Sequence, residues 1–168
     1  MKHHEVDHIQ MTIPAKPEYV GVVRLTVSGI SNRFGFTYDD IEDIKIAVTE
    51  ACTNVVNHAY RDGGMISASF HLFSDRLEIV IADRGQSFDM KDLRDSLGPV
   101  DATKPIADLK EGGLGLFLIN TLMDKLEIYD EFGVVLIMTK FLQRDEVKHG
   151  VHGLSSVQPK QSTDLRVD

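Results

Sequence analysis

The chain has 168 residues, of which 42% are hydrophobic and 26% charged, and its formal net charge is −8. This length suits one ordinary domain, and the composition argues against extensive disorder. The acidic balance excludes a broad surface for neutralising nucleic-acid phosphates, but it is compatible with a local ATP site or a basic protein partner.

Three features of the sequence predict a cytoplasmic protein. Cys52 is the only cysteine, so no intrachain disulfide can form, which suits a reducing compartment. The polar start Met1–Glu5 lacks the apolar segment of a signal peptide. No apolar run approaches the roughly 20 residues that a membrane span needs. We therefore expect no direct contact with a membrane or with nucleic acid.

The first part of the chain predicts one strand and two helices. Residues Ile9–Ile13 alternate between apolar and polar, as in a short strand. From Glu18, apolar residues recur every three or four positions and predict an amphipathic helix that ends near Gly35. A second helix follows, which Asp39 or Asp40 is expected to cap. Its apolar side comprises Ile41, Ile44, Val48, Ala51, Val55 and Ala59.

The second part predicts two hairpins separated by a long loop and a helix. Met65–Phe73 and Arg76–Ala82 are strand-like and joined by a short turn. Residues Gln86–Glu111 are polar and aperiodic, and loops of this length are usually functional or disordered. A glycine-rich cluster then leads into a helix, and Leu126–Tyr129 and Val134–Phe141 form the second hairpin.

This order of elements predicts an α+β fold. We expect a two-layer α/β sandwich, with a mixed, mostly antiparallel sheet covered by helices on one face. The strict strand–helix alternation of a doubly wound parallel sheet is missing from the pattern. We expect one domain over residues 1–142, followed by a polar tail over residues 143–168.

Polar side chains occupy one side of the predicted second helix. Glu50, Asn54 and His58 recur every four residues, and Asn57 falls between the first two at about 100° per residue. A carboxylate here can orient or deprotonate a nucleophile, and a carboxamide oxygen suits a hard cation such as Mg²⁺. The pattern also fits the solvated face of an ordinary helix, although two asparagines so close together disfavour helix formation.

A second candidate motif is Asp83-Arg84-Gly85, directly after a predicted buried strand. An aspartate at a strand end can accept a hydrogen bond from a ligand amino group. A glycine two residues later lets the chain turn close to that ligand. Taken alone, the motif fits an ordinary strand-ending turn better than a ligand site.

The third candidate motif is Gly112-Gly113-Leu114-Gly115, which opens a helix. Free backbone N–H groups and the helix dipole at such a point favour an anion such as phosphate. The motif is not a P-loop, since no Gly-Lys-Ser/Thr follows. A dinucleotide fingerprint is also excluded, because Leu118 stands where a glycine is needed. A flexible hinge for the preceding loop is the plain alternative.

The other histidines indicate no metal site. His3, His4 and His8 lie at or near the N-terminus and set up no metal geometry. His149 and His152 are three residues apart in a tail without a helix signal. We therefore expect metal binding only at Asn54.

In this order and spacing, the three motifs resemble the N, G1 and G2 boxes of the GHKL superfamily of ATPases and kinases, whose fold is called Bergerat. These boxes are a Glu with an Asn four residues later, an Asp-x-Gly, and a Gly-rich turn after a mobile ATP lid, where Gln86–Glu111 falls here. Four further segments resemble the RsbW family of anti-sigma-B serine-protein kinases, over roughly residues 5–142. They are Pro14–Ile30, Ile41–Tyr60, Asp83–Asp89 and Glu111–Asp124.

The resemblance implies a role for individual residues. Glu50 would be the catalytic carboxylate, Asn54 the Mg²⁺ ligand and Asp83 the acceptor for the adenine amino group. Arg24 resembles an arginine that contacts partners, with a solvated helix arginine as an equal alternative. The residues expected to bind ATP are Asn54, His58, Asp83, Gly85, Gly112, Gly113, Leu114, Gly115 and Thr139.

The resemblance also implies partners. Such proteins are homodimers that hold a sigma-B type sigma factor inactive and use Mg-ATP to phosphorylate a serine of a STAS-type anti-anti-sigma factor. The main alternative is a non-catalytic nucleotide-binding module that sequesters the sigma factor. A histidine kinase would need a helical hairpin with a phosphoacceptor histidine, and a gyrase-like or chaperone-like ATPase would need further domains.

Overall fold

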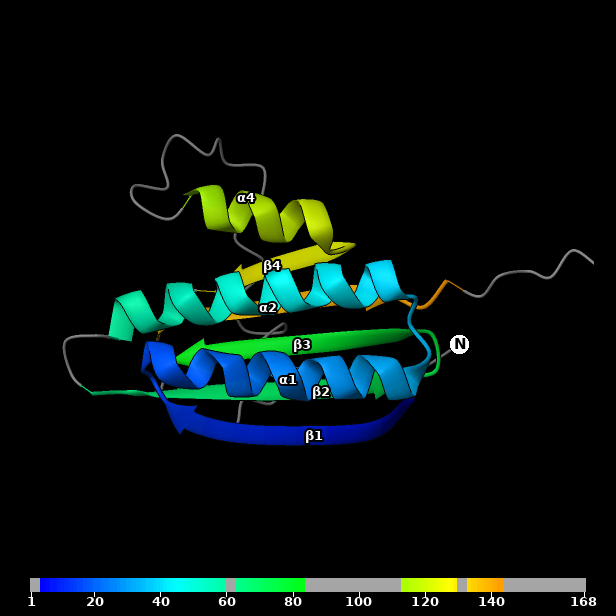
Figure 1. The fold of residues 1–168 in the computed structure, drawn as a ribbon, viewed down its shortest axis with the longest axis horizontal. Helices are drawn as coiled ribbons and strands as arrows, with labels where there is room; N and C mark the ends of the chain where they lie inside the picture. Colours follow the sequence, from blue (N-terminus) through cyan, green and yellow to red (C-terminus); the bar gives the residue numbers. More distant parts are fainter. Residues whose placement is uncertain (1–3, 60–62, 84–112, 130–132, 144–168) are drawn as a thin grey trace, which may run out of the picture.

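The computed structural model describes residues 4–59, 63–83, 113–129 and 133–143, which form two layers (Figure 1). One layer is a five-stranded sheet in the order β1-β2-β3-β5-β4. The other consists of helices that cover one face of that sheet. In chain order the elements are β1 (Glu5–Pro14), α1 (Pro17–Phe34), α2 (Tyr38–Ala59), β2 (Met65–Phe73), β3 (Arg76–Asp83), α4 (Gly113–Leu122), β4 (Lys125–Tyr129) and β5 (Val135–Phe141).

The predicted fold class is confirmed. All four strand pairings among the described residues are antiparallel, so this part of the sheet has no mixed character. The first strand is longer than the predicted Ile9–Ile13, because its outer half pairs with β2 although its side chains are mostly exposed. None of the described helices is long and apolar enough to cross a membrane.

The ends of α1 are set by local chemistry, as the sequence predicts. Pro17 stands in the first turn, where its missing N–H breaks no helical hydrogen bond. Gly35 ends the helix with a φ of 99°, a left-handed conformation that glycine adopts without a Cβ penalty. Its N–H donates to the carbonyl oxygens of Ser31 and Asn32, each at 3.2 Å.

The cap of α2 differs from the prediction. Thr37, not Asp39 or Asp40, precedes the first helical residue, and its Oγ1 accepts the N–H of Asp40 at 3.2 Å. Both aspartates lie inside the first turn, where they can no longer act as the cap. Their negative charges there still favour the positive end of the helix dipole.

The core lies between the sheet and the helices. Alternate residues of β3 and β5, such as Ile79, Ile81 and Met138, are fully buried and belong to the same cluster as Ile44 and Val48 of α2. Each such side chain contributes about 1.5–3 kcal/mol relative to exposure. The intervening residues form a smaller cluster on the opposite face of the sheet. It comprises Val80, Ala82, Tyr129, Val135 and Ile137.

Several predictions fall on residues that the structure does not describe. They are the lid Gln86–Glu111, Gly85, Gly112 and all but the first residue of the tail 143–168. The side chain of His58 is likewise outside the described set, although its backbone belongs to α2.

Candidate functional site

Two of the three predicted motifs, the polar side of α2 and the glycine-rich start of α4, lie next to each other. Glu50 and Asn54 are half-buried one turn apart on α2, and Gly115 lies in the first turn of α4 against them. A Cβ placed on Gly115 would lie 3.0 Å from Glu50 Oε2, 3.6 Å from Asn54 Oδ1 and 3.7 Å from Asn54 Nδ2. Glycine at position 115 therefore lets both polar side chains lie this close to the backbone of α4.

Asn54 presents an unsatisfied polar atom at this meeting point. Its Nδ2 is buried and has no hydrogen-bond partner among the described residues. Leaving a buried polar group unpaired costs about 1–3 kcal/mol, so native structures usually supply a partner such as a ligand or an ordered water. Rotating the carboxamide by half a turn offers its oxygen to the same space, and an oxygen is the ligand that Mg²⁺ prefers.

The N-terminus of α4 offers a further set of hydrogen-bond donors. The helix begins at Gly113 and runs for 10 residues, so its first N–H groups have no partner within the helix. Leu114, between the two glycines, is 81% exposed, so its side chain does not pack in the core. A helix start of this kind, beside a possible cation ligand, suits a polyphosphate.

Asp83 ends β3 on the helix-covered face of the sheet. Its N–H donates to the carbonyl oxygen of Val134 at 3.2 Å, which continues the pairing with β5 to the last residue of the strand. Its Oδ1 is buried and has no partner among the described residues. A buried, unpaired carboxylate oxygen at a strand end is the acceptor that an adenine amino group requires.

Gly133 faces this carboxylate and was not predicted as a site residue. Its φ is 121°, and a Cβ placed on it would overlap Asp83 Oδ1. The sequence marks this glycine only as part of the turn between β4 and β5. That it also stands against Asp83 follows from the register between β3 and β5, which no local signal reveals.

The structure does not bring Thr139 to Asp83. Thr139 pairs with Glu78, five residues before Asp83 on β3, which corresponds to roughly 16 Å along the strand. It also points to the face of the sheet away from the helices, since it alternates with Met138 of the main core. The resemblance made it an ATP-binding residue, whereas Val134 and Val135 are the β5 residues nearest to Asp83.

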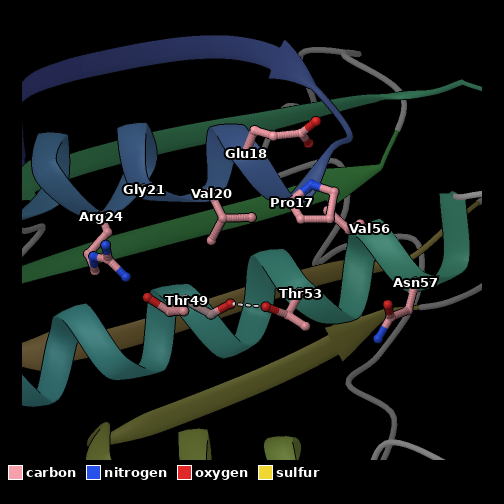
Figure 2. Close-up of a pocket in the computed structure, with 9 residues that line it drawn as sticks. All are labelled: Pro17, Glu18, Val20, Gly21, Arg24, Thr49, Thr53, Val56 and Asn57. Carbon is pink, nitrogen blue, oxygen red and sulfur yellow. Dashed lines mark hydrogen bonds between the residues drawn. The ribbon is translucent and has the colours of Figure 1, made fainter.

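A groove runs between α1 and α2 on the outer side of the helical layer (Figure 2). Its volume is about 410 Å³. A second hollow of about 410 Å³ continues beyond it as far as Glu50. Arg24 lines both, and Figure 2 shows its side chain extending from α1 towards Thr49 of α2. The predicted partner-contacting arginine thus borders a groove that leads to the candidate catalytic carboxylate.

Cys52 takes no part in this site. Its side chain is fully buried on the core side of α2. Burial disfavours the thiolate and raises the pKa of Cys52 to about 12. The thiol is therefore neutral at physiological pH and acts as a small apolar residue.

Comparison with known proteins agrees with this geometry. A family model for the histidine kinase-like ATPase domain matches residues 13–140. The chain is 68% identical over 161 residues to the serine-protein kinase RsbW of Halalkalibacterium halodurans, covering 96% of this chain and 99% of that protein. It is 53% identical over 151 residues to the serine-protein kinase RsbW of Bacillus cereus strain Q1, covering 89% and 94%.

A solved structure supports the fold. The crystal structure of the RsbU and RsbW domains of Rv1364c from Mycobacterium tuberculosis aligns with a TM-score of 0.58 and 19% identity. The alignment covers 83% of this chain and 34% of that one. With this fold, this site and these relatives, the chain belongs to the histidine kinase-like ATPase domain family and, within it, to the RsbW family of serine-protein kinases.

Proposed function

We propose that this protein is a cytoplasmic, homodimeric anti-sigma factor and serine-protein kinase. It sequesters a sigma-B type sigma factor and uses Mg-ATP to phosphorylate a serine of a STAS-type anti-anti-sigma factor. The observation that carries the proposal is the contact of Gly115 with Glu50 and Asn54, which joins a carboxylate, a cation ligand and a helix N-terminus.

The described residues fit ATP and Mg²⁺ at this place. Two buried polar atoms at this place, Asn54 Nδ2 and Asp83 Oδ1, have no hydrogen-bond partner among the described residues. Each belongs to a side chain that lies close to a glycine, Gly115 or Gly133. Asp83 would accept a hydrogen bond from the adenine amino group. The first turn of α4 would donate backbone N–H groups to the phosphates. Asn54 would contribute an oxygen to Mg²⁺, which supplies neutralisation of phosphate charge when bound.

Glu50 is the carboxylate that lies against the first turn of α4, at Gly115. In the transfer, the serine oxygen bonds to the γ-phosphorus while the bond from that phosphorus to ADP breaks. Glu50 holds the serine hydroxyl in line and accepts its proton. Phosphoryl transfer depends mainly on positioning and charge stabilisation, so the close contact with Gly115 matters directly for the rate.

The groove beside Arg24 is where we place the approach of the protein substrate. It opens on the surface of α1 and α2 and continues to Glu50, so a segment lying in it can reach the carboxylate. Residues 1–142 are proposed to form the catalytic and binding domain, followed by the polar tail 143–168.

Phosphotransfer to a STAS-type partner tests the proposal. The full chain is incubated with Mg-ATP and the partner, and mass spectrometry looks for one added phosphoryl group on a partner serine. Glu50→Gln keeps the size of the side chain and removes the proton acceptor, so transfer should fall by about 10²-fold or more while ATP remains bound. Asp39→Asn, an exposed carboxamide substitution at the start of the same helix, is the charge-matched control.

The outcomes separate the alternatives. Transfer that is lost in Glu50→Gln and kept in Asp39→Asn supports the kinase. ATP binding without transfer to any STAS-type partner favours a non-catalytic module that sequesters the sigma factor. Absence of ATP binding in the wild-type chain would refute the nucleotide site itself.

A further inference from the structure

A cluster of metal-ligating side chains lies on the opposite face of the sheet from the candidate ATP site. Glu5, His8 and His71 each place one ligand atom within 4.8 Å of the others. Glu5 and His8 belong to β1 at the edge of the sheet, and His71 belongs to the neighbouring β2 (Figure 1). None of the three belongs to the site already described.

The strand register brings the two histidines together. His8 and His71 are directly opposite each other in the β1–β2 ladder, so their side chains leave the same face of the sheet. Their rings stack with centroids 4.3 Å apart and an interplanar angle of 12°. His71 alternates with Phe70 and Leu72, which face the helices, and this places the pair on the face that the helices leave uncovered.

A β-bulge adds the carboxylate. In a regular strand, residues three apart such as Glu5 and His8 point to opposite faces. The register shifts between Glu5 and Asp7, where two residues of β1 advance against one residue of β2. This extra residue turns Glu5 to the face of His8, and bulges are a common device for re-aiming a side chain next to a site. Glu5 Oε1 consequently lies 3.2 Å from His71 Nδ1.

The surroundings of His71 hold its ring in place. Its side chain is 10% exposed. Its Nδ1 lies 3.2 Å from Glu5 Oε1. Glu78, the residue opposite His71 on β3, is bound to Arg76, whose Nε donates to Glu78 Oε1 at 2.9 Å. Glu78 is thus bound to Arg76, whereas Glu5 faces the two histidines.

We propose that Glu5, His8 and His71 form a binding site for a divalent transition-metal ion of the zinc class. Two imidazoles and one carboxylate, with water in the fourth position, are a recurrent ligand set for Zn²⁺. Bonds of about 2.0–2.2 Å in a tetrahedron place ligand atoms about 3.3–3.6 Å apart, slightly more than the 3.2 Å that separates Glu5 Oε1 from His71 Nδ1. The exposed ring of His8 rotates out of the stack to direct a nitrogen at the ion.

The bound ion would fasten the start of an edge strand to the sheet. The beginning of β1 has exposed side chains, including Val6 at 64%, and little core packing of its own. A metal joining Glu5 and His8 to the buried His71 adds a cross-strand link there. Because the ion binds the folded chain, it should also raise the thermal midpoint of unfolding.

Calorimetric titration of the untagged full chain with Zn²⁺, and visible absorption with Co²⁺, test the site. We expect one ion per chain and a tetrahedral Co²⁺ band. His8→Ala and Glu5→Gln alter exposed side chains and should weaken Zn²⁺ binding at least about tenfold. Loss of a residue that only supports a metal ligand already weakens binding by about this factor, and these two residues are proposed to be ligands themselves. His71→Gln should do the same, provided that circular dichroism shows an unchanged fold.

Two double variants serve as controls, His3→Ala with His4→Ala and His149→Ala with His152→Ala. Both should bind Zn²⁺ as the wild type does and show the same metal-induced rise in thermal midpoint. Binding that survives His8→Ala, or that is lost in either control, would overturn the proposal. Absence of binding in the wild type would overturn it as well and leave the cluster a cross-strand contact only.

Discussion

Replacing Gly115 by alanine tests the geometry of the candidate active site most directly. The new Cβ would lie 3.0 Å from Glu50 Oε2, and an ordinary contact at this position begins at 3.4 Å. The two groups must therefore separate by about 0.4 Å. Glu50 ends in a flexible, half-buried carboxylate, so it can move by this amount without disrupting the helices.

The stability and the activity of Gly115→Ala should then change in opposite directions. Replacing glycine by alanine in a helix stabilises it by up to about 1 kcal/mol. A misplacement of 1 Å in an active site costs about 10²-fold in rate, so 0.4 Å corresponds to about a five- to tenfold loss of phosphotransfer. The assays are urea denaturation followed by circular dichroism, and kcat/KM for phosphorylation of the partner.

Gly29→Ala is the matched control for this substitution. Gly29 lies in α1, is exposed, and has no atom within 4 Å of a Cβ built on it. It should show the gain in helix stability and full phosphotransfer. Full phosphotransfer in Gly115→Ala would refute the reasoning, because it would mean that Gly115 does not limit the position of Glu50.

Four other substitutions give distinct expectations. Asp83→Asn should leave the stability of the free chain nearly unchanged and abolish the rise in thermal midpoint with ATP; an undiminished rise would exclude Asp83 from adenine binding. Gly133→Ala should lower the free energy of unfolding by about 1–3 kcal/mol and weaken ATP binding, because it combines a positive φ with an overlap on Asp83. Gly63→Ala is its control. Gly63 has a φ of 62° and no atom within 4 Å of a Cβ built on it, so the substitution strains the backbone without an overlap and should keep ATP binding. The Cys52 thiol, whose pKa burial raises from 9.0 to about 12, should react with thiol reagents only after unfolding. Its raised pKa contributes stability that is complete below pH 9.0 and is lost as pH rises towards about 12, a slope that Cys52→Ala should reduce in urea melts.

The sequence is informative wherever the deciding signal is local. The spacing of apolar residues is sufficient to predict α1 and α2, because it repeats with the period of the helix itself. Gly35 predicts the end of α1, because the left-handed φ that ends the helix depends on this residue alone. Glu50 and Asn54 lie on one side of α2, because residues four apart are neighbours on a helix. The cap of α2 is the exception. Thr37, Asp39 and Asp40 are all good capping residues, so the sequence does not decide which of them precedes the first helical residue.

Tertiary structure decided everything that depends on how strands and helices meet. Strand register placed Gly133 against Asp83 and sent Thr139 to the other face, five residues away along β3. Pairing of β1 with β2, together with one extra residue in β1, gathered His8, His71 and Glu5 from positions up to 66 residues apart. Register and bulges are set by the packing of whole strands, and a shift of one residue reverses every side chain, so the sequence near any one of these residues carries no sign of its neighbours.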